Sequence, residues 1–261
     1  KPDFPGRMLD RAAFDASLVQ AAQRAGADVR FSCFIRRVTP RGEVELGGGG
    51  LLAAPVIVGA DGPRSRAGKA IGSVNTELVE TRQITVGLAQ PHGATDIFLS
   101  ADIPGGYGWL FPKGEVANLG AGVSPQYKAR LKSTVARLHS QLVKEGRVGP
   151  AVSALTGGAI PVGGMLKPFS FLKDTLVLLA GDAAGLANPV TGAGIAAAVH
   201  SGRLAGQAAA TRSAEEYENE LEDLYRAALE RALRRRRELL TVKPEKAALR
   251  RGWIAYPEYW T

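Results

Sequence analysis

Two apolar stretches, each running into a glycine and an aspartate, constrain the fold of this chain more than any other feature. Residues 56–62 read VIVGADG and residues 177–185 read VLLAGDAAG. Uninterrupted apolar runs of this kind are typical of strands that are covered on both faces. In open α/β sheets, ligands bind at the edge where such strands end. We therefore predict that Asp61 and Asp182 lie at one ligand-binding edge, although either aspartate alone could simply cap a turn or helix.

The segment after the second aspartate has almost no bulky side chains. Residues 186–198 read LANPVTGAGIAAA, and a helix is expected from about residue 192 to about residue 210. Unpaired N–H groups at a helix start attract an anion or an electron-rich ring edge. Small residues also recur every four positions, which suits packing on a sheet or a cofactor. These are Gly194, Ala198, Gly202, Gly206 and Ala210.

Between Ile84 and Val123 the sequence changes to short alternating stretches that Pro and Gly separate. This pattern predicts an antiparallel sheet. In GYGWLFPKG, the alternation of Tyr107, Trp109 and Phe111 places three rings on one face of a strand. The rings can line an apolar cavity or fill the core of this region, and both interpretations stay open here.

Three further helices are expected. Residues 11–25 carry an apolar stripe that should face the core, and Asp10 is a plausible cap. A polar amphipathic helix is expected at about residues 127–145. A charged helix at about residues 214–240 begins with acids and ends with the bases Arg234 to Arg237, as the helix dipole favours.

Composition excludes several classes of function. A single cysteine, Cys33, excludes an internal disulfide and a Cys-rich metal site, and the three histidines lack the spacing of metal ligands. The formal net charge is +8, but its basic cluster ends a helix that begins with acids, which indicates a solvated surface helix rather than a nucleic-acid partner. Contact with an anionic membrane surface is the alternative. Because no apolar run reaches the length of a membrane span, we expect a cytoplasmic protein with peripheral membrane contact as an option.

Several motifs resemble one family. ADGPRSRAGKAIG and GDAAGLANPVTGAGIAAAV are similar to the second and third flavin fingerprints of FAD-dependent oxidoreductases related to para-hydroxybenzoate hydroxylase. GYGWLFPKG and TGGAIPVGG resemble the geranylgeranyl reductase branch. The resemblance covers most of residues 7–212. It implies an α/β fold, in which a Rossmann-like, glutathione-reductase-type FAD-binding lobe carries an inserted, mainly antiparallel β substrate lobe and C-terminal helices.

The resemblance also implies a division into domains. It assigns residues 1–80 and 156–212 to the FAD-binding lobe, residues 81–155 to the substrate-binding lobe, and residues 213–261 to a C-terminal helical region.

Roles for individual residues follow from the resemblance. Asp182 would hold a ribityl hydroxyl, the next helix start would face the flavin pyrimidine edge, and Asp61 would lie near the pyrophosphate. The implied cofactor-binding residues are Arg11, Asp61, Gly62, Gly181, Asp182, Pro189, Gly192, Ala193, Gly194 and Ile195. The implied substrate-binding residues are Tyr107, Trp109 and Phe111, whose rings would wall an apolar cavity above the flavin. No proton donor is identified.

The activity that the resemblance implies is the reduction of carbon–carbon double bonds in an isoprenoid chain by hydride transfer from reduced FAD. NADPH or NADH would donate the electrons, and the substrate would be an isoprenoid lipid or pigment. A flavin-dependent hydroxylase or halogenase of an aromatic substrate is one alternative. A noncatalytic partner subunit is another.

The sequence departs from the family pattern at one important point. The family normally begins with a strand, a GxGxxG loop and a helix that hold the ADP half of FAD. GGGG at residues 47–50 precedes no expected helix and does not fit that role. We therefore expect an FAD-binding lobe that is incomplete at its N-terminus, with a separate polypeptide as one source of the missing segment. Ala193 also stands where these reductases often carry Glu.

Overall fold

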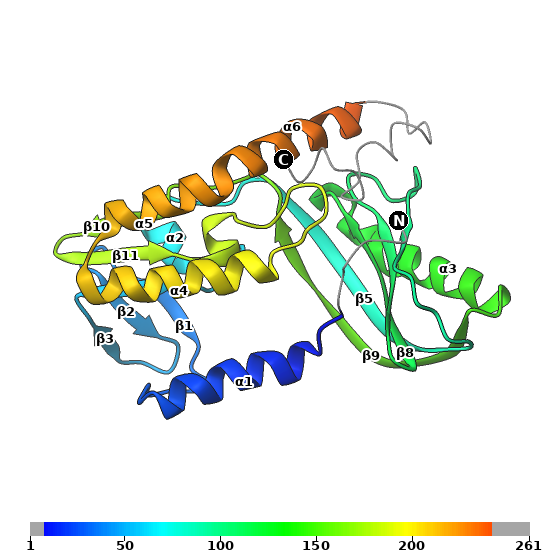
Figure 1. Ribbon diagram of the computed structural model, residues 1–261, viewed down its shortest axis with the longest axis horizontal. Coiled ribbons are helices and arrows are strands. Elements are labelled where there is room, and N and C mark those ends of the chain that lie inside the picture. Colours follow the sequence, from blue (N-terminus) through cyan, green and yellow to red (C-terminus); the bar gives the residue numbers. More distant parts are fainter. Residues whose placement is uncertain (1–7, 242–261) are drawn as a thin grey trace. The chain divides into compact units, whose positions relative to one another are not determined.

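The computed structural model describes residues 8–241 and divides the chain into two compact units (Figure 1). Among the described residues, the first unit combines residues 8–33 with Glu80–Gly158, and the second combines Phe34–Val79 with residues 159–241. Each unit has its own apolar core.

Two of the three junctions between the units fall inside long strands. They lie near the start of β5 (Leu78–Leu88) and near the end of β9 (Val148–Pro161). The described residues before Cys33 cluster with the first unit, whereas the sequence assigned them to the FAD-binding lobe. The division into functional domains stays a prediction.

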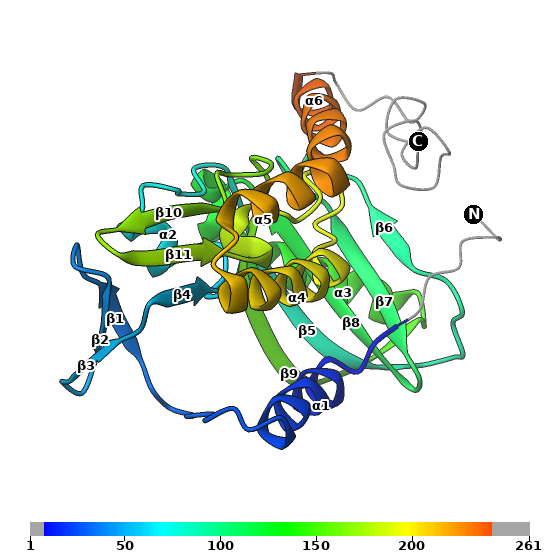
Figure 2. The same cartoon turned by 60° about the vertical axis from the view of Figure 1, so that its left-hand side comes forward.

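A five-stranded sheet forms the first unit, in the order β6-β7-β8-β5-β9 (Figure 2). Its shorter strands are β6 (Asp96–Phe98), β7 (Gly108–Lys113) and β8 (Val116–Val123). The pairs β6–β7, β7–β8 and β8–β5 are antiparallel. This pairing confirms the antiparallel sheet that the alternating sequence predicts.

One face of this sheet is covered by α3 (Leu131–Lys144), which packs on β8 and follows the 3₁₀-helix η1 (Pro125–Arg130). Leu110 is fully buried in the core that these elements share. Because side chains alternate along a strand, its neighbours Trp109 and Phe111 point to the opposite face. The core consists of Ile84, Val86, Ile103, Leu110, Ala117, Leu119, Ala121, Val123, Leu131, Val135, Leu138, Leu142 and Val148.

Helix α1 (Arg11–Arg24) has the predicted cap, because the Asp10 side chain accepts a hydrogen bond from the Ala13 N–H. The prediction that its apolar stripe faces a core is wrong. No residue of α1 is buried, and Leu18 is 46% exposed. The stripe consists mostly of alanines, which offer little apolar area to drive close packing.

The second unit contains a three-stranded sheet in the order β10-β11-β4. Its strands are β10 (Phe169–Leu172), β11 (Thr175–Leu179) and β4 (Val56–Gly59). Strand β11 is buried throughout and pairs in parallel with β4, as the apolar runs predict. The expectation that β4 is covered on both faces is wrong, because Val58 is 40% exposed. Among the described residues β4 is an edge strand, with a neighbour on one side only.

A separate antiparallel sheet contains β1 (Ile35–Val38), β2 (Glu43–Leu46) and β3 (Leu51–Ala53). The GGGG sequence forms the turn between β2 and β3, where Gly49 and Gly50 have positive φ angles. This sequence is therefore a hairpin turn, and no helix follows it.

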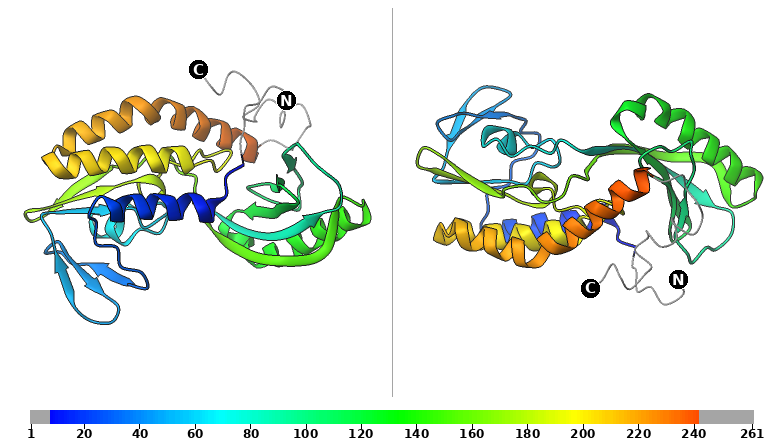
Figure 3. Two further views of the ribbon diagram at one scale, coloured as in Figure 1. Left: turned by 60° about the horizontal axis from the view of Figure 1, so that its bottom comes forward. Right: turned by 90° about the horizontal axis from the view of Figure 1, so that it is seen from above.

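The helices of the second unit are α2 (Arg66–Ala70), α4 (Ile195–Thr211), α5 (Ala214–Leu221) and α6 (Ala227–Thr241), with a π-helical turn η3 (Glu222–Arg226) before α6. Helix α4 packs on β4 and β11 and lies beside α5 (Figure 3).

The small-residue stripe of α4 does not pack on the sheet of the second unit, and its packing on a cofactor stays a prediction. The buried face of α4 consists of Ser201, Ala205 and Ala208. The stripe of small residues lies outside that face, with Gly202 and Gly206 exposed. A Cβ built on either glycine would meet nothing within 4 Å among the described residues.

Tyr217 joins the helical region to the central strand. It is 2% exposed, and its hydroxyl donates a hydrogen bond to the Leu179 carbonyl at 2.6 Å, at the end of β11. Desolvation raises the pKa of Tyr217 above its ordinary value. The contact fixes α5 against the strand end from which the second Gly-Asp loop begins.

We predict that Tyr217→Phe lowers the free energy of unfolding by about 1–3 kcal/mol, because a buried carbonyl loses its donor. Urea denaturation followed by circular dichroism measures this change. The matched control is Tyr225→Phe, whose half-buried hydroxyl contacts His200 Nδ1 at 3.2 Å. Equal losses in both variants would contradict a special role for the Tyr217 contact.

Candidate functional site

The two Gly-Asp loops leave the β4–β11 pair at the same edge. Gly59 lies opposite Leu179 in the parallel register, and the Ala180 N–H donates to the Gly59 carbonyl at 3.0 Å. Asp61 and Asp182 follow directly along their chains. The structure thus confirms that these two aspartates lie at one edge of the sheet.

The Asp61 carboxylate accepts hydrogen bonds from its own loop. Its Oδ1 accepts a hydrogen bond from Ser65 Oγ at 2.5 Å, and its Oδ2 accepts one from the Arg66 N–H at 2.6 Å. Both donors lie at the start of α2, so this carboxylate organises the helix entry. Gly62, with φ of +81°, lies in the turn between Asp61 and the start of α2. A direct role of Asp61 and Gly62 toward a cofactor stays a prediction.

Asp182 has a different setting. It is half-buried in the short 3₁₀-helix η2 (Gly181–Ala184). A Cβ built on Gly194 would lie 3.1 Å from Asp182 Oδ1, so the carboxylate lies directly against the backbone where α4 begins. Gly194 is the N-cap of α4, and no described side chain caps this helix. Ile195, the first helical residue, is 39% exposed.

The start of α4 is therefore open, and its N–H groups lie beside a carboxylate. Free N–H groups at a helix start, at the positive end of the helix dipole, attract electron-rich atoms. A carboxylate accepts hydrogen bonds from hydroxyl groups. The pair can bind a ligand that carries a hydroxyl chain next to an electron-rich ring edge.

Gly181 is constrained in two ways. Its φ is +58°, a conformation that favours glycine. Its N–H donates to Ser201 Oγ at 2.9 Å inside the core, and a Cβ at this position would lie 3.1 Å from the Ala198 Cβ. Ser201 of α4 thus holds the strand end next to Asp182.

Asn188 shapes the loop before α4, and sequence reasoning missed it. Its Oδ1 accepts hydrogen bonds from the N–H groups of Val190 at 2.9 Å and Thr191 at 3.0 Å. Its own N–H donates to the Ala193 carbonyl, and the Gly192 N–H donates to the Asn188 carbonyl. The available signal was the Asn-Pro dipeptide, which favours this kind of side-chain turn.

The prediction that the basic cluster is fully exposed to solvent is wrong for Arg236. It lies on α6, is 8% exposed, and its Nη1 donates to the Pro189 carbonyl at 3.3 Å. Burial lowers the pKa of Arg236 below its ordinary value, with a smaller opposing effect of Glu77. The C-terminal helix therefore contacts the loop that leads into α4, a long-range contact without a local sequence signal.

Arg11 belongs to a different unit from the two Gly-Asp loops. It lies on α1 in the first unit, where its Nε and Nη2 donate to the Asp15 carboxylate at 3.1 and 3.0 Å. Its assignment to the cofactor stays a prediction.

The three predicted rings share one face of the sheet in the first unit. The ring centroids are 5.8 Å apart for Tyr107 and Trp109, and 6.0 Å apart for Trp109 and Phe111. Trp109 Nε1 donates to Gln83 Oε1 at 3.1 Å. A Cβ on Gly120 would lie 2.4 Å from the Trp109 ring, so the ring packs directly against that glycine. Gln83 and Gly120 fix the indole, and sequence reasoning missed both.

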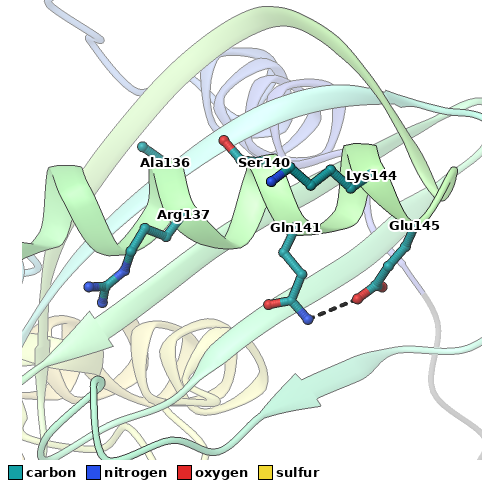
Figure 4. A pocket seen from close by; sticks show the side chains of 6 residues that line it. All are labelled: Ala136, Arg137, Ser140, Gln141, Lys144 and Glu145. Atoms are coloured by element: carbon teal, nitrogen blue, oxygen red, sulfur yellow. Dashed lines mark hydrogen bonds between the residues drawn. The ribbon is translucent and has the colours of Figure 1, made fainter.

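A hollow of about 540 Å³ lies along α3 and does not resemble a ligand site (Figure 4). All of its lining residues lie on α3 or directly after its last residue. Two of them bond to each other, since Gln141 Nε2 donates to Glu145 Oε1 at 2.8 Å. No second element supplies a group to it. The lining residues are Ala136, Arg137, Ser140, Gln141, Lys144 and Glu145.

Within residues 8–241, no group of three or more His, Cys, Asp or Glu side chains could hold a metal ion. No helix in that part of the chain is both long and apolar enough to cross a membrane.

Comparison with solved structures defines the class of protein. The chain superposes on a geranylgeranyl bacteriochlorophyll reductase-like protein of Thermoplasma acidophilum with a TM-score of 0.76 and 22% identity, covering 98% of this chain and 76% of that one. It also superposes on the myxobacterial FAD-dependent halogenase CndH with a TM-score of 0.62 and 20% identity, covering 99% and 71%. The fold is that of the FAD-dependent oxidoreductases.

Sequence relatives identify the family. Residues 79–159 match the model of the geranylgeranyl reductase catalytic domain. The digeranylgeranylglycerophospholipid reductase of Methanosarcina acetivorans is 30% identical over 84% of this chain and 57% of the relative. Digeranylgeranylglycerophospholipid reductase 2 of Methanopyrus kandleri is 34% identical over 78% and 56%. The chain belongs to the geranylgeranyl reductase family and spans somewhat more than half the length of these relatives.

We predict an alkaline loss of stability that depends on Tyr107. Burial raises the pKa of Tyr107 to about 12. An unfolded tyrosine loses its proton near pH 10, so the contribution of Tyr107 is present below about pH 10 and declines as the pH rises toward about 12. Urea denaturation at about pH 9 and about pH 11 should show a larger difference for the wild type than for Tyr107→Phe. Equal differences would contradict the assignment.

Proposed function

We propose that the second unit binds the flavin end of FAD and that the protein reduces carbon–carbon double bonds of an isoprenoid chain. The observation that carries this proposal is the position of the Asp182 carboxylate against the uncapped start of α4 at Gly194. The residues present fit the cofactor, because a ribityl chain offers hydroxyl donors and the flavin pyrimidine edge offers acceptors. Gly194 has no side chain that would separate the start of α4 from the Asp182 carboxylate.

Each residue then has a definite task. Asp182 accepts a hydrogen bond from a ribityl hydroxyl, and the first N–H groups of α4 face the electron-rich ring edge. Asn188 holds the preceding loop in shape through Val190 and Thr191. Reduced FAD, when bound, supplies the hydride for the reaction. We propose NADPH or NADH as the source of its electrons.

For the substrate, we propose an isoprenoid lipid or pigment, as the names of the relatives suggest. An isolated double bond offers almost no polar group for recognition, so apolar contact area must position it. The face with Tyr107, Trp109 and Phe111 provides such area mainly through the half-buried Tyr107 and Phe111, because Trp109 is only 8% exposed. Because Gln83 and Gly120 fix the Trp109 ring in advance, binding need not order it.

Membrane contact is part of this proposal. An isoprenoid lipid resides in a membrane, and the chain carries a formal net charge of +8. Arg231 and Arg234 on α6 are exposed and could approach anionic headgroups. The hydroxylase and halogenase alternative has weaker support, because such enzymes match this chain at the level of fold, whereas the relatives at 30–34% identity are named reductases.

We predict that the purified chain binds riboflavin and FAD, with quenching of flavin fluorescence. Riboflavin carries the ring and ribityl chain without the ADP half, so it probes the residues described above. Asp182→Ala should weaken riboflavin binding by about tenfold or more, because a hydrogen bond to a charged group is lost. Glu216→Ala, on an exposed position of α5, is the control. A wild-type chain that binds neither compound would overturn the flavin assignment.

The reaction itself can be tested without oxygen. We expect NADPH to bleach the visible absorbance of the bound flavin, and a geranylgeranyl lipid to restore it while gaining a pair of hydrogens at each reduced double bond. The same lipid with saturated chains is the control and should leave the flavin bleached. Mass spectrometry of the lipid measures the gain. Reoxidation by oxygen alone, with an aromatic substrate hydroxylated or halogenated, would favour the alternative enzyme.

A further inference from the structure

Asn75 bridges the two Gly-Asp loops. It lies between α2 and β5 and is 9% exposed. Its side-chain Nδ2 donates to the Pro63 carbonyl at 3.1 Å and to the Asp182 carbonyl at 2.9 Å. One amide group thus contacts the loop that leaves β4 and the loop that leaves β11.

The chemistry of the neighbours fixes the orientation of this amide. Both contacts are backbone carbonyls, which only accept hydrogen bonds, so the NH₂ group must face them. The two hydrogens of that group point in fixed directions within one plane. An amide in this position therefore sets the separation of the two carbonyls, which a single hydroxyl donor could not do.

Asn75 acts where the sheet no longer holds the loops together. The β4–β11 register ends at Gly59 and Leu179, followed by the bond from the Ala180 N–H to the Gly59 carbonyl. Asp182 lies beyond that point. The loop is also tightly packed behind Asn75, because a Cβ on Gly185 would lie 2.2 Å from the Gly164 carbonyl and 3.2 Å from Asn75 Oδ1.

We propose that Asn75 is a positioning residue for the flavin site, which holds the Asp182 loop at a fixed spacing from the loop after Asp61. This inference rests on the proposed flavin function of Asp182. If Asn75 served stability alone, its loss would weaken flavin binding only as far as it weakens the fold.

The test compares Asn75→Asp with Thr175→Ala. Asn75→Asp keeps the shape of the side chain but places an acceptor against two acceptors. Thr175 is also 9% exposed, and its hydroxyl donates to the Ala54 carbonyl at 3.4 Å at the opposite end of β11. Both variants lose a buried hydrogen-bond donor in the second unit. Their thermal midpoints therefore show how much stability each variant loses, and the change in riboflavin affinity is compared with that loss.

Three measurements are made at a temperature where each variant is folded: riboflavin affinity, the visible spectrum of bound riboflavin, and amide hydrogen exchange in residues 181–187. We expect Asn75→Asp to weaken riboflavin binding about tenfold, which corresponds to about 1.4 kcal/mol. We also expect it to shift the visible spectrum of bound riboflavin and to speed amide exchange in residues 181–187. Thr175→Ala should keep wild-type affinity, spectrum and exchange in this segment.

Wild-type riboflavin affinity in Asn75→Asp would overturn the inference. So would a loss of affinity that is proportional to the drop in thermal midpoint, with the same proportion in both variants. If Asn75→Asp does not fold, Asn75→Ala takes its place in the same comparison. If the wild type binds no riboflavin, the flavin assignment fails. Hydrogen exchange without ligand then still decides whether Asn75 holds the loop. If it does, amide exchange at residues 181–187 must rise in Asn75→Ala and not in Thr175→Ala.

Discussion

The site depends on the parallel pairing of β4 with β11, in which Gly59 lies opposite Leu179. This register brings two loops that are far apart in the sequence to one edge of the sheet. A slip by one residue would turn the apolar side chains of β11 to the opposite faces and displace Asp182 by about 3.3 Å. The full burial of β11, from Thr175 to Leu179, makes such a slip costly.

Small residues make the loop after β11 possible. Gly181 and Gly185 have positive φ angles, and Gly194 lies against both Asp182 and Ala187. Side chains at these positions would strain the backbone or meet a neighbouring atom. The loop can therefore bring a helix start and a carboxylate within a few ångströms of each other, which bulkier residues would prevent.

Part of this site could be predicted because its signals are local. Asp182, the bare loop and the start of α4 follow one another in the sequence, and the rings of Tyr107, Trp109 and Phe111 follow the period of a strand. The same local reasoning was wrong where burial depends on distant elements. It expected cover for α1 and for both faces of β4, and it expected a solvated Arg236.

The sequence by itself determined the two strand-to-loop motifs, the alternation of the aromatic strand and the membership of the chain in the geranylgeranyl reductase family. Only the tertiary structure decided which side chains hold those motifs in place. Asn75 reaches Asp182 across 107 residues, and Gln83 reaches Trp109 from a different strand. Periodicity and turn chemistry act over a few residues, whereas such contacts exist only once the sheet has aligned its strands.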